Sequence, residues 1–244
     1  WLLVVNQPLK GTYLFMPPLQ SAPDRFAGSE HKGVRRGVRD WTELMLKDHG
    51  FLRLYWYNLH CIDEMMWRSN QPSPSRVKQA AERGIKTIIN LRGPRDDGGW
   101  QLEAEACVTY GVSLVDFTAR SRAAPTKEMI YGARDLFATV TGPSLMHCKS
   151  GADRAGLMSA LYLLIHKEMP VAVAREQLAF KYGHVKQAKT GLLDAFFDAY
   201  EPFEAKGMPF FDWLDNVYDP DILQDSFMSR GWANRLVDDI LRRE

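Results

Sequence analysis

The sequence predicts an α/β fold with a mostly parallel central sheet flanked by helices on both faces. From residue 60 onward, short apolar runs alternate with stretches that have helical periodicity. The apolar runs lack the polar–apolar alternation of half-exposed strands, which is typical of parallel strands buried on both sides. The chain has 244 residues, of which 45% are hydrophobic and 25% are charged, and these values are ordinary for a globular protein.

The alternation of helices and strands follows from local signals. Gly84 and Gly111 each follow a helical stretch, where glycine readily takes the left-handed conformation that ends a helix. Thr126 precedes another helical stretch and is expected to cap its N-terminus. Helices are therefore expected at 72–84, 99–111, 125–140 and 155–169, and strands at 85–91, 112–117 and 144–147. Beyond residue 170 the pattern is helical, at 171–183, at 190–203 and in a last segment that ends at 244.

The chain is predicted to have three parts. They are an N-terminal extension with an amphipathic helix at 1–54, a main domain at 55–200, and a helical C-terminal extension packed on that domain at 201–244. Basic residues beside the amphipathic helix leave peripheral membrane contact open. The sequence starts at Trp1 without a methionine, which is typical of a fragment. A structural turn at the start of the main domain is expected from Trp67, Arg68, Asn70 and Gln71.

Charge and composition exclude several classes of protein. The formal net charge is +1, so no overall field favours nucleic acid, and any anion site must be local. Three cysteines do not make a disulfide framework and fit a reducing, cytoplasmic compartment. No run reaches the roughly 18 apolar residues that span a bilayer. The six histidines are scattered and no G-x-x-x-x-G-K loop is present, so neither a metal nor an organic cofactor is expected.

The stretch HCKSGADRAG, residues 147–156, joins a predicted strand to a predicted helix. Ligand sites of parallel α/β sheets lie at such carboxyl ends. Successive backbone N–H groups in a tight loop form an anion nest, and the helix dipole adds positive charge. Small residues let the backbone approach an anion closely, and an arginine can hold two of its oxygens. The stretch therefore predicts a phosphate site formed by Lys149, Ser150, Gly151, Ala152 and Asp153 and closed by Arg154.

Cys148 lies in the same environment and is predicted to be a nucleophile. A thiol at a helix N-terminus beside an arginine loses its proton more readily than a free cysteine, and the thiolate is the reactive form. His147 is expected to be buried and to support the loop through hydrogen bonds, not to act as the general base. Cys107 falls inside a predicted helix and is assigned to the core.

A cysteine and an arginine separated by five residues, preceded by histidine, resemble the signature of the cysteine-dependent protein tyrosine phosphatase superfamily. The order of MMWRSNQPSP, IKTIINLRG and HCKSGADRAG resembles its bacterial dual-specificity-phosphatase-like branch. The resemblance covers residues 55–200, so the main domain is expected to be a phosphatase domain. It implies a phosphomonoester hydrolase with a phosphocysteine intermediate, acting on phosphotyrosine or mixed phosphoprotein substrates. In this resemblance Cys148 is the nucleophile and Arg154 binds the phosphoryl group.

The resemblance also implies a general acid, because the family uses an aspartate on a separate loop to protonate the leaving group. Asp116 lies 32 residues before Cys148, directly after an apolar strand, and fits this role. Asp153 within the phosphate site is the rival assignment, and its negative charge speaks against a densely phosphorylated head group. Arg120 and Arg122 follow Asp116, and they either recognise an anionic substrate or are solvated.

One residue departs from the family pattern. The family usually has serine or threonine directly after the arginine, and its hydroxyl stabilises the thiolate that leaves when water hydrolyses the phosphocysteine. Ala155 occupies this position, so the second step is expected to be slow, with Ser150 as a partial substitute. Two alternatives stay open: a lipid or lipopolysaccharide phosphate phosphatase at the membrane surface, and a phosphate-binding pseudophosphatase. The expected partner is accordingly a phosphorylated protein or a phospholipid.

Overall fold

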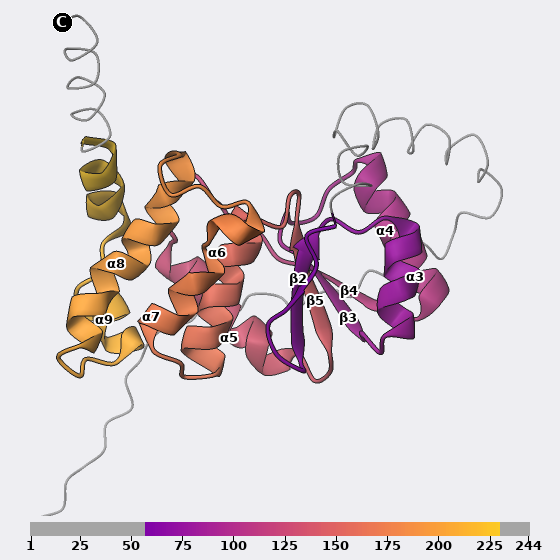
Figure 1. The fold of residues 1–244 in the computed structure, drawn as a ribbon, viewed down its shortest axis with the longest axis horizontal. Helices are drawn as coiled ribbons and strands as arrows, with labels where there is room; N and C mark the ends of the chain where they lie inside the picture. The colour runs from indigo at the N-terminus through magenta and orange to yellow at the C-terminus, as the bar shows by residue number, and fades with distance from the viewer. Residues whose placement is uncertain (1–56, 230–244) are drawn as a thin grey trace, which may run out of the picture.

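The computed structural model describes residues 57–229, which contain a five-stranded sheet with helices on both faces (Figure 1). The strand order is β1-β2-β5-β3-β4. All neighbours pair in parallel except β1, which pairs antiparallel with β2. The predicted fold class is therefore confirmed. The strands are β1 (His60–Cys61), β2 (Met66–Asn70), β3 (Thr87–Asn90), β4 (Ser113–Asp116) and β5 (Ser144–Cys148).

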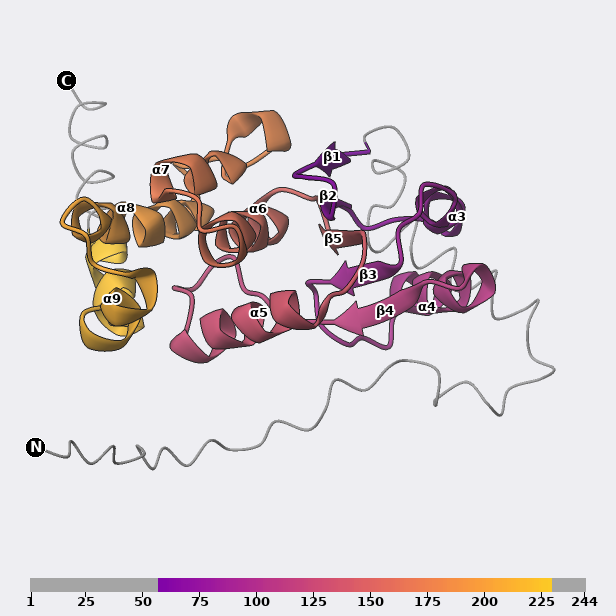
Figure 2. The ribbon, with the colours of Figure 1, turned by 90° about the horizontal axis from the view of Figure 1, so that it is seen from below.

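Helices form a layer on each face of the sheet, with α3 and α4 on one face and α5 and α6 on the other (Figure 1). These four helices are α3 (Pro74–Glu82), α4 (Gly98–Tyr110), α5 (Lys127–Thr139) and α6 (Asp153–Leu161). Three further labelled α-helices follow α6 and lie away from the sheet (Figure 2). They are α7 (Val171–Ala174), α8 (Leu192–Glu204) and α9 (Phe210–Asn216).

The helix ends follow the predicted signals. Gly111 adopts a left-handed conformation with φ of 66° at the C-terminus of α4. Gly84 has φ of 89° two residues after the end of α3. The Thr126 side chain accepts a hydrogen bond from the backbone N–H of Met129 at 3.2 Å and so caps α5. These three local predictions are confirmed.

Buried residues form two clusters, one on each face of the sheet, because neighbouring residues of a strand point to opposite faces. In β3, Ile88 packs in the cluster beneath α3 and α4, and Ile89 packs in the cluster beneath α5 and α6. In β5, Leu145 and Met146 divide in the same way. The division explains why these strands are continuous apolar runs in the sequence. Cys107 is buried in the first cluster, as predicted for a core cysteine.

Strand β2 replaces the predicted turn at the start of the main domain. Its sequence, MWRSN, is mostly polar, and local propensity therefore gives no strong strand signal. The strand forms because its backbone pairs along its whole length with β5, from Met66 opposite Ser144 to Asn70 opposite Cys148. Long-range pairing thus overrides the local pattern and buries the polar side chains beside the end of β5.

The single helix predicted at 171–183 is also wrong, because three short helices occupy this range. After α7 come the 3₁₀ turns η4 (Arg175–Gln177) and η5 (Phe180–Tyr182). The Gln177 carbonyl accepts a hydrogen bond from Arg68 Nη1 at 2.7 Å. The Gln177 carbonyl therefore makes a tertiary contact, whereas in a continuous helix it would point along the helix axis and accept a hydrogen bond from the next turn.

The predicted division into three parts is only partly within the described residues. The extension at 1–54 and residues 230–244 lie outside them, and the boundary at residue 200, which falls inside α8, stays a prediction. Part of the C-terminal segment contacts α5, because Tyr131 Oη donates a hydrogen bond to Asp215 Oδ1 at 2.7 Å. Residues 220–229 are helical. No helix within 57–229 is long and apolar enough to cross a membrane.

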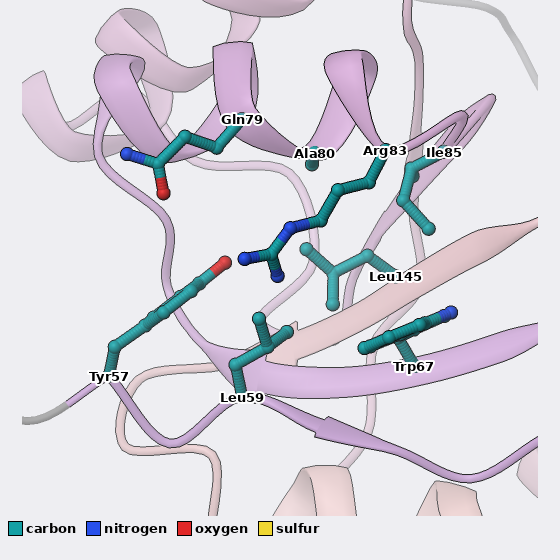
Figure 3. A pocket seen from close by; sticks show the side chains of 8 residues that line it. All are labelled: Tyr57, Leu59, Trp67, Gln79, Ala80, Arg83, Ile85 and Leu145. Atoms are coloured by element: carbon teal, nitrogen blue, oxygen red, sulfur yellow. The ribbon is translucent and has the colours of Figure 1, made fainter.

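A small cavity lies between α3 and the sheet, on the face opposite α6 (Figure 3). Its volume is about 10 Å³, which is the room that one water molecule needs. Tyr57 and Arg83 extend toward each other across it, above the apolar side chains of Leu59 and Trp67 (Figure 3). The cavity is therefore too small for a substrate.

Candidate active site

The residues 148–154, here called the phosphate loop, connect the end of β5 to the start of α6. Strand β5 lies between β2 and β3, in the middle of the sheet. In the sequence β3 and β4 come before β5, but in the sheet β5 lies between β2 and β3. The direction in which successive strands are added therefore reverses at β5. Crevices at such switch points are the usual ligand sites of open α/β sheets.

Two side chains hold the carbonyl groups of the phosphate loop. Arg68 Nη2 donates to Gly151 O at 2.7 Å and to Ala152 O at 3.0 Å. Asn58 Nδ2 donates to Ser150 O at 3.1 Å. The C=O and N–H of a trans peptide point in opposite directions, so the N–H groups of residues 151–153 turn away from these donors. The Gly151 N–H accordingly points at Cys148 Sγ, at 3.2 Å.

Gly151 is required by the geometry of this loop. Its φ is 77°, in the region that favours glycine. A Cβ at this position would lie 2.7 Å from the Asn70 backbone nitrogen and 2.8 Å from the Ser69 carbonyl carbon. Both neighbours belong to the backbone of β2, which cannot move aside. The loop therefore approaches the strand more closely than any other residue type allows.

Arg68 is the most deeply buried cation beside the phosphate loop. Its side chain is fully buried in β2, with the guanidinium 4.1 Å from the centre of the Tyr182 ring. Burial lowers the pKa of Arg68 to about 10, against the opposing effects of Tyr182, Cys148 and Asp153. The group therefore stays charged at neutral pH and adds positive charge to the surroundings of Cys148, which is itself buried.

His147 is completely buried in β5, where it was expected. Its Nε2 lies 2.6 Å from Glu103 Oε1 on α4. The other oxygen of Glu103 accepts a hydrogen bond from Gln71 Nε2 at 3.1 Å, and Arg92 donates to the Gln71 amide oxygen. This buried chain of polar groups joins the end of β5 to α4 and to the residues that follow β2 and β3. Its position fits the predicted supporting role of His147.

Asp116 ends β4 and lies two strands away from β5. Asn90 of β3 is paired with Asp116 on one side and with His147 on the other. Two strand spacings place these outer Cα atoms about 10 Å apart. The Asp116 carboxylate accepts hydrogen bonds from Asn90 Nδ2 at 2.7 Å and from Trp100 Nε1 at 3.1 Å. These bonds hold the carboxylate at the carboxyl end of the strands, where the phosphate loop also begins, but they do not connect it to that loop.

Asp153, the rival acid, is held by an ion pair. Its Oδ1 lies 2.8 Å from His184 Nδ1, and the other ring nitrogen lies 2.7 Å from Asp194 Oδ2. Burial opposes a charge on His184, but the hydrogen bonds and charges of the two carboxylates outweigh it and raise the pKa of His184 to about 9. Asp153 therefore faces an imidazolium at neutral pH.

Arg154, at the end of the phosphate loop, lines an open depression together with residues 119–123 of the β4–α5 connection. Within residues 57–229 its guanidinium makes no ion pair. Lys149 is partly buried, Ser150 is exposed, and the Ser150 hydroxyl accepts a long hydrogen bond of 3.4 Å from the Ala152 N–H. Ala155 is completely buried in the first turn of α6. No group of three or more His, Cys, Asp or Glu side chains among the described residues is placed to hold a metal ion.

Three residues that hold this site escape sequence-based prediction: Asn58, Arg68 and Glu103. Asn58 and Arg68 reach the phosphate loop from positions far away in the sequence, although Arg68 was expected in a turn, and Glu103 reaches His147. The sequence places His184 in a segment that could border the pocket but does not indicate its partners. The sequence contains one signal for Glu103, because it is a single acidic residue on the buried face of a predicted helix. A buried carboxylate of this kind requires a partner, but the sequence does not say which one.

The phosphate loop lies in a region of the chain that matches a known family. The sequence model described as "DSP-PTPase phosphatase fused to NAD+ kinase" matches residues 60–191. The chain belongs to this family. The predicted resemblance to dual-specificity-type cysteine phosphatases is thereby confirmed, and the matched residues include the whole phosphate loop.

The dual specificity protein phosphatase TpbA of Pseudomonas aeruginosa is a curated relative. One strain's TpbA is 27% identical over 122 residues, which are 50% of this chain and 53% of TpbA. The chain thus spans about half the length of the curated relatives that it matches. A crystal structure of TpbA has a TM-score of 0.49 at 20% identity and covers 70% of this chain and 90% of its own. A DUF442 protein from Shewanella putrefaciens has a TM-score of 0.50 at 16% identity, covers 63% and 95% of the two chains, and shares the fold.

Proposed function

We propose that the protein is a phosphatase that hydrolyses phosphomonoesters through a phosphocysteine intermediate. The observation that carries the proposal is the position of Cys148 at the start of the phosphate loop, where the Gly151 backbone N–H points at its sulfur from 3.2 Å. Backbone donors aimed at one point stabilise a trigonal or tetrahedral oxyanion there. Arg154, six residues later, can bind two further oxygens of the same phosphoryl group.

In the first step the Cys148 thiolate attacks phosphorus. The S–P bond forms while the P–O bond to the substrate breaks, and the leaving oxygen takes a proton from Asp116. We assign the acid to Asp116 and not to Asp153, because the Asp153 carboxylate is already engaged by the His184 ring at 2.8 Å. The Asp116 carboxylate accepts hydrogen bonds from two donors, so it must loosen one of these bonds to reach the leaving oxygen.

In the second step water attacks phosphorus and the S–P bond breaks. Asp116 takes the proton of the attacking water, and inorganic phosphate and the Cys148 thiolate are released. Ala155 supplies no hydroxyl to the leaving sulfur, and the Ser150 hydroxyl is the nearest group in sequence that could do so. Hydrolysis of the intermediate is therefore the slower step.

The substrate proposed here is a phosphorylated protein, with phosphotyrosine as the first side chain to test. TpbA is named a dual specificity protein phosphatase, and it has been crystallised in complex with phosphotyrosine. The membrane-lipid alternative depends on residues 31–56, which lie outside the described range. Co-sedimentation with vesicles, with and without residues 1–56, tests that alternative separately.

The test is turnover of p-nitrophenyl phosphate and of a phosphotyrosine peptide by wild type and Cys148→Ser. Loss of the nucleophile should reduce turnover of both by at least about a thousandfold. Cys61→Ser is the matched control, since Cys61 is exposed on the edge strand β1. If wild type binds phosphate but turns over neither substrate, the protein is a pseudophosphatase and the proposal is wrong.

A further inference from the structure

Three arginines meet around the open depression beside the phosphate loop. The depression has a volume of about 320 Å³ and is lined by Arg154 and by residues 119–123, which include Arg120 and Arg122. Both of the latter are exposed, and the lining contributed by residues 57–229 contains no acidic side chain. Among the described residues, none of the three guanidinium groups makes an ion pair or a hydrogen bond to a side chain. No carboxylate among the described residues therefore pairs with these three cations, although the net charge of the chain is only +1.

The backbone that carries Arg120 and Arg122 is fixed at both ends. We call residues 119–125 the arginine arch. At one end the Ala119 N–H donates to Leu91 O at 3.2 Å. At the other, the Ala124 N–H donates to Gln224 Oε1 at 2.9 Å, and Pro125 O accepts from Tyr218 Oη at 2.7 Å.

A loop anchored in this way presents its side chains from a defined position. The ordering entropy of the backbone is already lost on folding, so an incoming anion does not have to fix the arch again. Like charges held close together also repel each other, and an anion that enters between them relieves this repulsion. The arginine arch is thus built to receive negative charge next to Arg154.

We propose that the arginine arch is a second anion subsite that selects phosphopeptides with another anionic side chain beside the phosphorylated residue. This inference rests on the proposed function, because Arg154 belongs to the wall shared by the phosphate loop and the depression. The occupant is a peptide because the depression is open and its arginines are exposed. Sites for small molecules are usually enclosed and bury most of the ligand surface, whereas a peptide can cross an open surface.

The experiment compares two phosphotyrosine peptides that differ only next to the phosphotyrosine, where one has aspartates and the other alanines. The measured quantity is the ratio of kcat/KM for the acidic peptide to that for the neutral one. Wild type should prefer the acidic peptide, and added NaCl should reduce the preference. Arg120→Ala and Arg122→Ala should each reduce the ratio by about two- to fivefold, the range for exposed ion pairs. Lys78→Ala on α3 removes the same charge from an exposed site on the opposite face of the sheet and should leave the ratio unchanged.

Two results would overturn the inference. The first is a wild-type ratio near one; the second is a ratio that neither arginine substitution alters, even if both rates change. Binding of both peptides to Cys148→Ser, measured by fluorescence polarisation, tests the subsite without catalysis. If neither peptide is turned over by wild type, the proposed function fails, while a binding preference that depends on Arg120 and Arg122 still supports the subsite. Inositol bisphosphate is tested as a competitor of peptide binding. If it competes strongly and neither peptide is preferred, the depression is a small-molecule site and the inference is contradicted.

Discussion

Replacing His184 by glutamine should remove a pH-dependent part of the stability of the protein. His184 is 2% exposed, and each of its ring nitrogens faces a carboxylate, Asp153 at 2.8 Å and Asp194 at 2.7 Å. A neutral imidazole has only one N–H and cannot donate to both, whereas an imidazolium can. The folded protein therefore holds the second proton more tightly than the unfolded chain does.

The size of the effect follows from the pKa of His184. Its rise from 6.5 to about 9 corresponds to about 3 kcal/mol of unfolding free energy, at about 1.4 kcal/mol for each pKa unit. Because the folded-state pKa is the higher one, this contribution is complete below pH 6.5 and is lost as the pH rises toward about 9. Arg68, which also interacts with Asp153, keeps its charge over most of this range because its pKa is about 10.

The assay is urea unfolding at several pH values between about 6 and about 9. The wild-type free energy of unfolding should fall by up to about 3 kcal/mol over this interval relative to the free energy of His184→Gln. His166→Gln, at an exposed position, is the control and should follow the wild-type curve. Parallel curves for wild type and His184→Gln would refute the reasoning, since they would mean that His184 carries no extra proton in the folded state.

Three other substitutions test the proposed site. Gly151→Ala should reduce phosphatase activity by more than about tenfold, because the added Cβ collides with the β2 backbone. Gly84→Ala is the control: Gly84 has a similar positive φ but no neighbour within 4 Å, so the backbone strain should lower the Tm while the activity is kept. Asp116→Asn should slow phosphotyrosine hydrolysis by about a hundredfold and p-nitrophenyl phosphate hydrolysis much less, because p-nitrophenolate leaves without a proton; a larger selective loss in Asp153→Asn would reassign the acid. Wild type should release a burst of p-nitrophenol in stopped-flow measurements, and Ala155→Ser should abolish the burst and raise the steady rate by about tenfold; a linear time course in wild type would contradict a slow second step.

The phosphate loop could be predicted because its parts are close together in the sequence. Cys148, Gly151 and Arg154 lie within seven residues, and the geometry that joins them is local. The ends of α3, α4 and α5 were predictable for the same reason, since a capping residue acts on the turn next to it. Each of these signals can be evaluated without knowing where the rest of the chain goes.

The residues that hold the loop in place could not be predicted because their partners are remote. Arg68 contacts Gly151, 83 residues later, and Asn58 contacts Ser150, 92 residues later. Nothing near Arg68 distinguishes a buried arginine in a strand from a solvated one in a turn. The partners of His184 were likewise unpredictable, because only the folded chain brings Asp153 and Asp194 to its two ring nitrogens.

The anchoring of the arginine arch separates substrate selection from phosphate binding, because the two depend on different stretches of the polypeptide. The phosphate loop is braced by Arg68, which lies within the region 60–191 that matches the family model, whereas the far end of the arch is secured by Tyr218 and Gln224, which lie beyond it. Relatives that retain the common region but diverge after it would inherit the reaction without inheriting the preference. Evolution can then diversify the choice of target by altering a tail, while the chemical machinery stays under separate constraint.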